Sequence, residues 1–421
     1  MTVLLSHTPS ASVSNLKGIK VAAQNSAQTL IRVENLFKLF GKKPEKFMSR
    51  VHQGESKDKI LSETGHTLGL QNINLEINKG EVFVIMGLSG SGKSTLIRHF
   101  NRLIEPTEGR IYIDHTDVTA LKPKALQYFR RNRVSMVFQH FALMPHLTVI
   151  ENVSYGLAVQ GISTKERFAK ADEWLQAVGL TGYDSQYPWQ LSGGQQQRVG
   201  LARALCTDAD ILLLDEAFSA LDPLIRNAMQ DQLIELQKQL HKTIIFITHD
   251  LNEALRLGDR VAILKDGAVV QIDKPVDILL KPVNDYVKAF VKDVNLTRVL
   301  TAADVMEPPA TSIVAKTQAE AFKQMRQQPN EHSFYLTAEG FEGILHQQKG
   351  LKATKSDNNP QEIELLQDPS WLPPDAILEV VLPLLLEANY PLPVIDAKGV
   401  LLGEVSRVSL AKVLASTKSR K

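Results

Sequence analysis

The sequence holds one cysteine among 421 residues, Cys206, and almost no excess charge of either sign. A single cysteine excludes an internal disulfide framework and is compatible with a reducing compartment. Its place after Ala204 and Leu205 favours a small buried core side chain over a reactive thiol. Because 48 basic residues nearly balance 46 acidic ones, for a net charge of +2, bulk attraction gives no reason to expect nucleic acid as a partner.

No stretch of the sequence is apolar for long enough to cross a bilayer. The most apolar one, residues 376–386, contains Glu379 and Pro383 and is well short of the ~20 residues that a span needs. Residues 1–30 lack a basic start followed by a long apolar core, so we expect a disordered extension there and no secretory signal. We therefore expect a cytosolic protein that reaches a membrane only through a partner.

The length allows about two to four domains, and the first of them has the pattern of a layered fold. Residues 31–40 and 68–77 alternate apolar and polar side chains, as strands of a half-exposed sheet do. A charged insert, residues 41–67, separates the two strands. Its apolar positions are compatible with short amphipathic helices on the surface.

Three short runs, residues 81–86, 211–214 and 243–248, are almost entirely apolar, which is typical of buried parallel strands. Their alternation with helical stretches predicts an α/β fold. A mostly helical block closed by Pro188 interrupts the strand series. We interpret this block as a helical subdomain inserted over about residues 142–195.

The composition changes after Pro282, where two weakly similar stretches follow, about 302–351 and 373–414. A polar segment of low complexity, residues 352–360, joins them. The second stretch contains the pattern strand, Asp-x-x-Gly, strand over residues 391–403, which predicts a β-hairpin. A weaker echo of that pattern occurs in the first stretch.

A glycine-rich loop, GLSGSGKS, follows the first buried strand and precedes a helical stretch, which is the context that a phosphate-binding loop requires. Glycines let consecutive backbone N–H groups point at phosphate oxygens, and the positive end of the helix assists them. We expect the lysine to reach the β- and γ-phosphates and the serine after it to offer its hydroxyl to Mg²⁺. The predicted nucleotide ligands are Gly87, Ser89, Gly90, Ser91, Gly92, Lys93, Ser94 and Thr95.

Two acidic residues end the second buried strand, where a carboxylate can reach a metal at the sheet edge. We expect Asp215 to bind Mg²⁺ and Glu216 to act as the general base toward the attacking water. A general base commonly contributes ~10²–10⁴-fold to the rate. An apolar run that ends in Asp-Glu is common by itself, and its place after the phosphate loop makes it informative.

Three further side chains complete the predicted site. The Gln139 amide can bind Mg²⁺ or orient water, and it stands at the junction with the helical block. His249 follows the third buried strand, which favours a hydrogen bond to the γ-phosphate over a purely structural histidine. Phe40 ends the first strand and is the candidate for stacking on adenine, with a core phenylalanine as the alternative.

A turn of sequence LSGGQ, residues 191–195, lies between the phosphate loop and the acidic pair. With it, residues 31 to about 295 resemble an ATP-binding-cassette (ABC) transporter ATPase of the P-loop NTPase fold, a RecA-like core with a helical subdomain. In that family two subunits pack head to tail with each ATP between them. The resemblance thus implies a homodimer, or a pairing with a second cassette chain, with Asp222 near the subunit boundary. It also implies that Ser192, Gly193, Gly194 and Gln195 face the partner's ATP.

A narrower resemblance, covering nearly everything after residue 30, is to the ATPase subunits of osmoregulated glycine betaine/proline importers of the ProV type. It rests on the insert and on the strings NRLIEPT, FALMPH and DEAFSALDPL. It implies two membrane permease subunits docked beside Gln139 and Met144, and a binding protein that delivers the solute. The location implied is the cytoplasmic face of the cell (inner) membrane.

Residues 300–421 resemble a tandem pair of cystathionine-β-synthase-type (CBS) modules of the α+β class. Adenosine-binding modules often carry Gly-x-x-[Ser/Thr]-x-x-Asp, whose Asp holds ribose hydroxyls. The second module has Ser409 at that position, and the first, after Gly343, lacks both polar positions. Regulation by ionic strength therefore suits the pair better than ribose binding.

Other functions remain open at this stage. The chain is alternatively the ATPase of another small-molecule importer, or a soluble regulatory ABC ATPase. Soluble ABC proteins of translation or DNA repair usually have two cassettes or a long coiled-coil insertion, and this sequence has neither. A sensor with a vestigial ATPase is disfavoured because Lys93, Asp215, Glu216 and His249 are all present.

Overall fold

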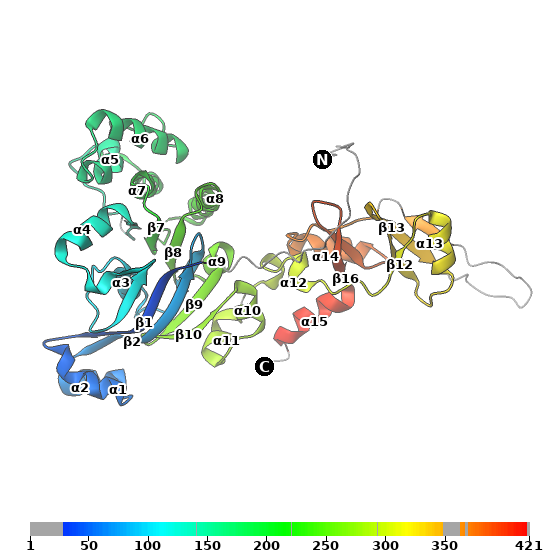
Figure 1. The fold of residues 1–421 in the computed structure, drawn as a ribbon, viewed down its shortest axis with the longest axis horizontal. Coiled ribbons are helices and arrows are strands. Elements are labelled where there is room, and N and C mark those ends of the chain that lie inside the picture. Colours follow the sequence, from blue (N-terminus) through cyan, green and yellow to red (C-terminus); the bar gives the residue numbers. More distant parts are fainter. Residues whose placement is uncertain are drawn as a thin grey trace, which may run out of the picture.

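A computed structural model describes residues 28–418 with gaps at 140, 220, 293, 348–362 and 367–368. The predicted N-terminal extension and the predicted link at 352–360 therefore lie almost wholly outside the described residues. The chain forms a larger body around two sheets, and the C-terminal elements extend from one side of it (Figure 1). Within the described residues, no helix is both long and apolar enough to cross a membrane.

The centre of the larger body is a sheet of six strands, five of them parallel and the edge strand β10 antiparallel. The three runs predicted as buried strands lie in it as β3, β8 and β7, which confirms that prediction. In spatial order the strands are β10 (Ala268–Asp273), β9 (Arg260–Lys265), β3 (Val82–Met86), β8 (Thr243–Thr248), β7 (Ile211–Asp215) and β6 (Val134–Val137).

A second, four-stranded antiparallel sheet packs against one face of the first. It contains both strands predicted from alternating side chains, here paired as β1 and β2. Its order is β2 (Thr67–Asn78), β1 (Thr29–Phe40), β4 (Glu108–Ile113) and β5 (Thr116–Asp117). The charged insert between β1 and β2 forms a 3₁₀ turn and two short helices, α1 (Met48–His52) and α2 (Lys57–Thr64), as its apolar positions predict.

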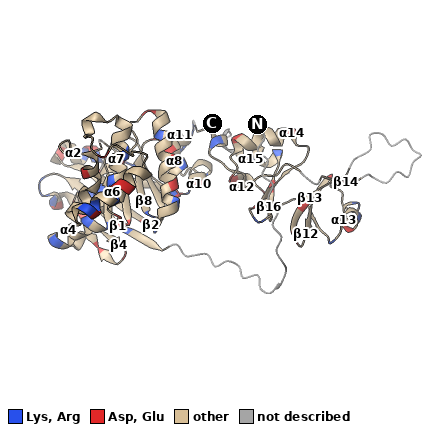
Figure 2. Ribbon diagram, turned by 90° about the horizontal axis from the view of Figure 1, so that it is seen from above, with Lys and Arg blue, Asp and Glu red and all other residues tan. Residues whose placement is uncertain are grey.

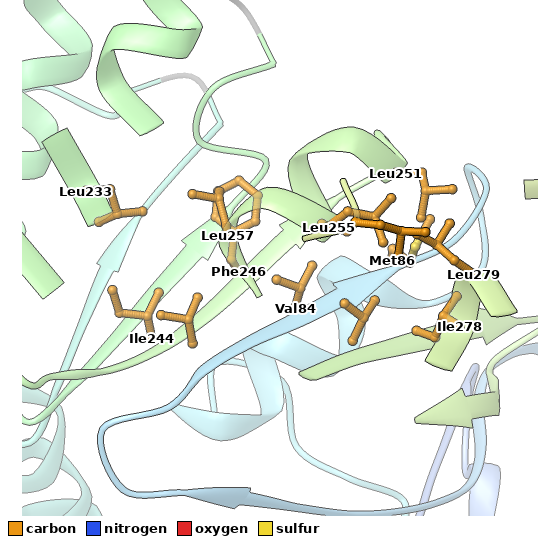
Figure 3. Packing of buried hydrophobic residues seen from close by; sticks show 14 of the residues in the cluster. Val84, Met86, Leu233, Ile244, Phe246, Leu251, Leu255, Leu257, Ile278 and Leu279 are labelled. Atoms are coloured by element: carbon orange, nitrogen blue, oxygen red, sulfur yellow. The ribbon is translucent and has the colours of Figure 1, made fainter. Parts of the chain in front are cut away.

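Buried side chains on β3 alternate between the two faces of the central sheet, which explains why its sequence is apolar throughout. Phe83 and Ile85 belong to the core under the antiparallel sheet. Val84 and Met86 face the helices α8 (Pro223–Leu240), α9 (Leu251–Leu257) and α10 (Pro275–Leu280). Figure 3 shows this second face, where Phe246 of β8 packs among leucines of α8 and α9. A strand covered on both sides is buried and rigid.

Helices cover the remaining faces of the larger body (Figure 1). Segments of both charges are scattered over the larger body (Figure 2), in keeping with the small net charge. The helices are α3 (Lys93–Phe100), α4 (Pro123–Asn132), α5 (Val149–Val159), α6 (Thr164–Ala177), α7 (Gly193–Cys206), α8 (Pro223–Leu240), α9 (Leu251–Leu257), α10 (Pro275–Leu280) and α11 (Asp285–Val291).

The helical block predicted over about 142–195 has its own core, in which α5 and α6 pack against α7. The core contains Val153, Leu175, Val199 and Cys206, so the packing of this block continues along α7 beyond residue 195. Burial raises the pKa of the Cys206 thiol to about 11, which leaves it protonated and unreactive at neutral pH.

The C-terminal elements form two halves, one with a four-stranded sheet and the other with a two-stranded sheet. The first contains α12 (Ala302–Val305), β11 (Ser312–Val314), α13 (Gln318–Met325), β12 (His332–Thr337), β13 (Gly340–Gln347) and β14 (Ile363–Leu366). The second contains α14 (Leu378–Glu387), β15 (Leu392–Ile395), β16 (Leu401–Val405) and α15 (Arg407–Lys418). The β15–β16 pair is antiparallel, which confirms the predicted hairpin.

One apolar cluster runs from the helical face of the central sheet through α12 into the second C-terminal half, while the sheet of the first half has a core of its own. Leu279 of α10, Leu300 and Val305 belong to it together with Leu378 of α14 and Val405 of β16. The expected boundary near residue 300 therefore crosses packed side chains rather than an exposed linker.

Candidate nucleotide site

The glycine-rich loop joins the end of β3 to the start of α3 and needs glycine for steric reasons at two points. A Cβ at Gly87 would overlap the Leu264 carbonyl oxygen and lie 2.7 Å from Ser91 Oγ. Gly92 has φ 102°, and a Cβ there would lie 2.7 Å from the Gly69 oxygen. The loop thus stays close to the neighbouring backbone and leaves its own N–H groups at the N-terminus of α3.

Lys93 is the first residue of α3, and its ammonium lies over the loop. Nζ donates hydrogen bonds to the carbonyl oxygens of Gly87 (2.9 Å) and Leu88 (3.1 Å) and lies 4.0 Å from Glu216 Oε1. Burial lowers the pKa of Lys93, while the carboxylates of Glu216 and Asp215 oppose that shift. A phosphate bound at the loop would add negative charge beside a cation that is already in place.

Oxygen ligands suitable for Mg²⁺ meet between α3 and β7. Ser94 Oγ donates to Asp215 Oδ1 at 2.9 Å, and Arg98 Nη2 lies 3.1 Å from Asp215 Oδ2. Mg²⁺ is usually held by one or two protein oxygens together with phosphate oxygens and water, and this pair fits that pattern. The sequence interpretation missed Arg98, although its place one helical turn after Ser94 puts both on one helix face.

Glu216 follows β7 with φ 48°, a left-handed conformation that is uncommon for a non-glycine residue and is found at functional sites. Its Oε2 accepts a hydrogen bond from Gln139 Nε2 at 3.1 Å and lies 3.8 Å from His249 Nδ1. Lys93, Gln139 and His249, predicted separately from distant strand ends, thus converge on one carboxylate. Such an arrangement can hold and orient a water near a phosphate.

Lys93, Gln139 and Glu216 border a cavity of about 660 Å³, while His249 and Gly87 are not among the described residues that line it. Phe40, which is 37% exposed, also lines it. The other predicted ligands that line it are Ser89, Gly90, Gly92, Lys93, Ser94 and Thr95. The sequence interpretation missed Lys57, Asp58 and Leu61 of the insert and Asp266 of the β9–β10 turn, because no motif marks them.

Ser91 and Asp215 are buried beside this cavity rather than lining it. The Ser91 side chain points inward, with its hydroxyl facing a buried space near Gly87. Its backbone is therefore the part of Ser91 that can contact a phosphate. Asp215 reaches the site through Ser94 Oγ.

The LSGGQ turn lies at the N-terminus of α7. Ser192 caps this helix by accepting from Gln195 N at 3.3 Å, while Gln195 Oε1 accepts from Ser192 N at 2.9 Å. A Cβ at Gly194 would lie 2.9 Å from Ile225 Cγ2, so the turn packs closely on the start of α8. Ser192 and Gly193 are exposed. None of the four signature residues predicted as ligands lines the cavity that the described residues form.

Asp222 caps the other helix at this surface, α8. Its Oδ1 accepts from the backbone N–H groups of Leu224 and Ile225, both at 3.1 Å. It also does not line the cavity among the described residues. The structure of one chain therefore holds the predicted ligands in two groups, one at the phosphate loop and one at the N-termini of α7 and α8.

Comparison with known proteins agrees with this geometry. The family model described as ABC transporter matches residues 70–219. The glycine betaine transport ATP-binding protein OpuAA of Bacillus subtilis is 48% identical over 386 residues, which cover 91% of this chain and 92% of the relative. This chain belongs to the ATP-binding subunits of ABC transporters. The resemblance to the glycine betaine group is confirmed.

Other relatives carry related names. The glycine betaine/proline betaine transport system ATP-binding protein ProV of Escherichia coli is 42% identical, with coverage of 91% of this chain and 97% of the relative. The trimethylamine N-oxide transport system ATP-binding protein TmoW of Pelagibacter ubique is 45% identical, with 78% and 93% coverage. The dimeric structure of MJ0796, a bacterial ABC transporter cassette, matches with a TM-score of 0.51 and 36% identity over 58% of this chain and 99% of that one.

The Ser94→Ala variant tests the Mg²⁺ ligand pair. The variant lacks Ser94 Oγ and keeps only the Asp215 carboxylate of the pair. We therefore expect Mg²⁺ to increase the affinity for ATP less in the variant than in the unaltered chain. Affinity in EDTA should stay within about twofold, because a serine that meets only the metal contributes nothing when the metal is absent. Titration calorimetry with and without Mg²⁺ measures both. Ser185→Ala, at an exposed serine, is the matched control, and an equal loss in EDTA would contradict the metal role.

Proposed function

We propose that this chain is the ATP-hydrolysing subunit of an importer for glycine betaine and related compatible solutes, active in osmotic stress. The observation that carries the ATPase part is the convergence of Lys93, Gln139 and His249 on Glu216. Near full-length similarity to ATP-binding subunits named for glycine betaine supports the solute. Carnitine and trimethylamine N-oxide, named in other relatives, are the alternative solutes.

In the proposed reaction, ATP binds with its phosphates at the loop and its base at Phe40. Lys93 holds the β- and γ-phosphates, and Ser94, Asp215 and Gln139 hold the Mg²⁺ that screens their charge. Glu216 accepts a proton from the attacking water, and His249 donates a hydrogen bond to the γ-phosphate. As the water oxygen attaches to the γ-phosphorus, the bond from that phosphorus to the bridging oxygen of ADP breaks, and ADP, phosphate and the proton leave when the site opens.

The second group of ligands serves the partner's nucleotide in this proposal. Two copies pack head to tail, so that Ser192, Gly193, Gly194 and Gln195 of one copy close on the γ-phosphate held by the other. Asp222 lies at the boundary between them. The distribution of the predicted ligands over two separate surfaces of one chain, and the dimeric MJ0796 cassette, support this assembly.

Further partners follow from the same proposal. Two permease subunits bind the helical block beside Gln139 and Met144 and convert dimer closure into movement of the solute path. A substrate-binding protein delivers the solute on the other side and touches the ATPase only indirectly. The chain then lies at the cytoplasmic face of the inner membrane, held there by the permease.

We further propose that residues 300–421 form a tandem CBS module that regulates the ATPase. In the first half the short strand β11 runs parallel to β12, the first strand of a hairpin, and in the second half a single parallel bridge joins Leu372 to Val394 of the other hairpin. The two hairpin turns meet, with Phe341 N donating to Gly399 O at 3.3 Å. Ser409, at the position of the ribose-binding Asp, is buried and bonded to Ser406, which disfavours a ribose ligand there.

A transport assay tests the importer proposal. The chain is purified with its two permease subunits and binding protein, placed in vesicles, and given radiolabelled glycine betaine. We expect uptake that requires internal ATP and is lost in Lys93→Ala. Uptake of carnitine or trimethylamine N-oxide, with no uptake of glycine betaine, would overturn the assignment of glycine betaine as the solute. ATP hydrolysis that does not respond to the permease would overturn the importer role.

The same vesicles test the C-terminal proposal. Arg407 donates hydrogen bonds to the carbonyls of Leu385 (3.2 Å), Leu386 and Ala388 (both 2.9 Å) and so ties α15 to α14. We expect Arg407→Ala to keep basal ATPase activity and to shift the dependence of uptake on internal salt. Lys398→Ala, at an exposed turn of the same module, is the control. An unchanged salt dependence in Arg407→Ala, and in a chain ending at residue 300, would contradict regulation by this module.

A further inference from the structure

The insert between β1 and β2 reaches the nucleotide cavity. Lys57, Asp58 and Leu61 of α2 line it together with Phe40 and Lys93. Lys57 and Leu61 are four residues apart in α2 and so lie on one face of the helix. That face is the one turned toward the cavity.

A small apolar core fixes the insert on the sheet. Ile60 is fully buried, and Met48 and Val51 are nearly so, packed with Leu39 of β1 and Leu68 of β2. Helices this short are not stable alone, so this packing holds α1 and α2 in place. The insert is therefore a folded part of the site's surroundings and not a loose loop.

His66 ties the two ends of the insert together. Its ring is buried, with Nε2 3.0 Å from the Lys42 oxygen and Nδ1 2.8 Å from the Thr64 oxygen. The Phe47 ring packs on it with centroids 4.3 Å apart. A Cβ at Gly41 would overlap the imidazole, so the chain enters the insert closely against His66. These contacts of His66 hold the insert, and with it α2, in a fixed position beside the cavity.

Three apolar side chains, Phe40, Leu61 and the mostly buried Leu68, lie in the otherwise polar lining of the cavity. The Phe40 ring lies against the backbone of Gly69, where a Cβ would come within 2.7 Å of Cε2. Leu61 is 49% exposed and opens onto the same space. An aromatic ring and a leucine beside one cavity suit the two flat faces of a purine, which bury apolar surface when a base enters.

Lys57 adds a positive charge to the lining of the cavity. Its partial burial lowers the pKa of the ammonium, and the carboxylates of Asp266 and Asp58 act in the opposite direction. An ammonium that lines the cavity can donate a hydrogen bond to a ring nitrogen of the base or to a ribose hydroxyl.

We propose that the insert, residues 41–67, forms the second wall of the base site, with Leu61 packing on the purine face opposite Phe40 and Lys57 donating to the base or ribose. This inference rests on the proposed ATP site. It assigns to the insert a role in holding the nucleoside part of ATP, apart from the phosphate loop that holds the triphosphate.

Binding of ATP and of inorganic tripolyphosphate to the full chain separates the two ends of the site. Leu61→Ala should weaken ATP about 5- to 10-fold, the effect of losing a half-buried leucine contact, and leave tripolyphosphate unchanged. Lys57→Met should act in the same direction, and Leu61→Met should restore ATP binding. The controls are Leu103→Ala, an exposed leucine that does not line the cavity, and Lys59→Met on the other side of α2.

Each outcome decides a different claim. Unchanged ATP binding in Leu61→Ala and Lys57→Met would overturn the proposal that the insert forms the second wall of the base site. Equal loss of ATP and tripolyphosphate would also overturn it, because the insert would then support the loop and not the base. Lys93→Ala should lose both ligands. If it keeps both, the proposed phosphate site itself is wrong, whatever the insert variants show.

Discussion

The structure depends on the burial of β3, β7 and β8 on both faces of one parallel sheet. Parallel strands end at a common edge, so the phosphate loop after β3, the acidic pair after β7 and His249 after β8 must meet there. The apolar side chains of these strands keep that edge rigid, which holds Lys93 and Glu216 within 4.0 Å of each other. The chemistry proposed for this chain follows from that packing.

The sequence predicted this part of the molecule well, for physical reasons. A strand covered on both faces must be apolar throughout, and a phosphate loop must carry glycines where the backbone passes closest, as at Gly87. Both constraints are local and readable in the residues. The hairpin around Gly399 was readable in the same way, since the turn needs its positive φ of 81°.

Contacts between distant segments could not be predicted from the sequence. Nothing in the sequence around Lys57 or Leu61 shows that the insert borders the nucleotide cavity, because this depends on how α2 packs on β1 and β2. The shared apolar cluster of Leu279 and Leu300 is likewise a property of the folded chain. The same cluster connects α12 and the second C-terminal half directly to the helical face of the central sheet, and a regulatory role would use this connection.

The central claim is that each ATP is enclosed by the loop of one chain and the LSGGQ turn of another. Cys206 is buried and protonated, so single cysteines placed in Glu216→Gln chains at the exposed positions 89 and 192 report on this directly. A mixture of Ser89→Cys and Ser192→Cys chains, treated with a short bifunctional maleimide, should form cross-linked dimers only with ATP. Either chain alone should give none. Cross-linking to the same extent with and without ATP would contradict the account. A mixture that forms no cross-linked dimers with ATP bound would also contradict it.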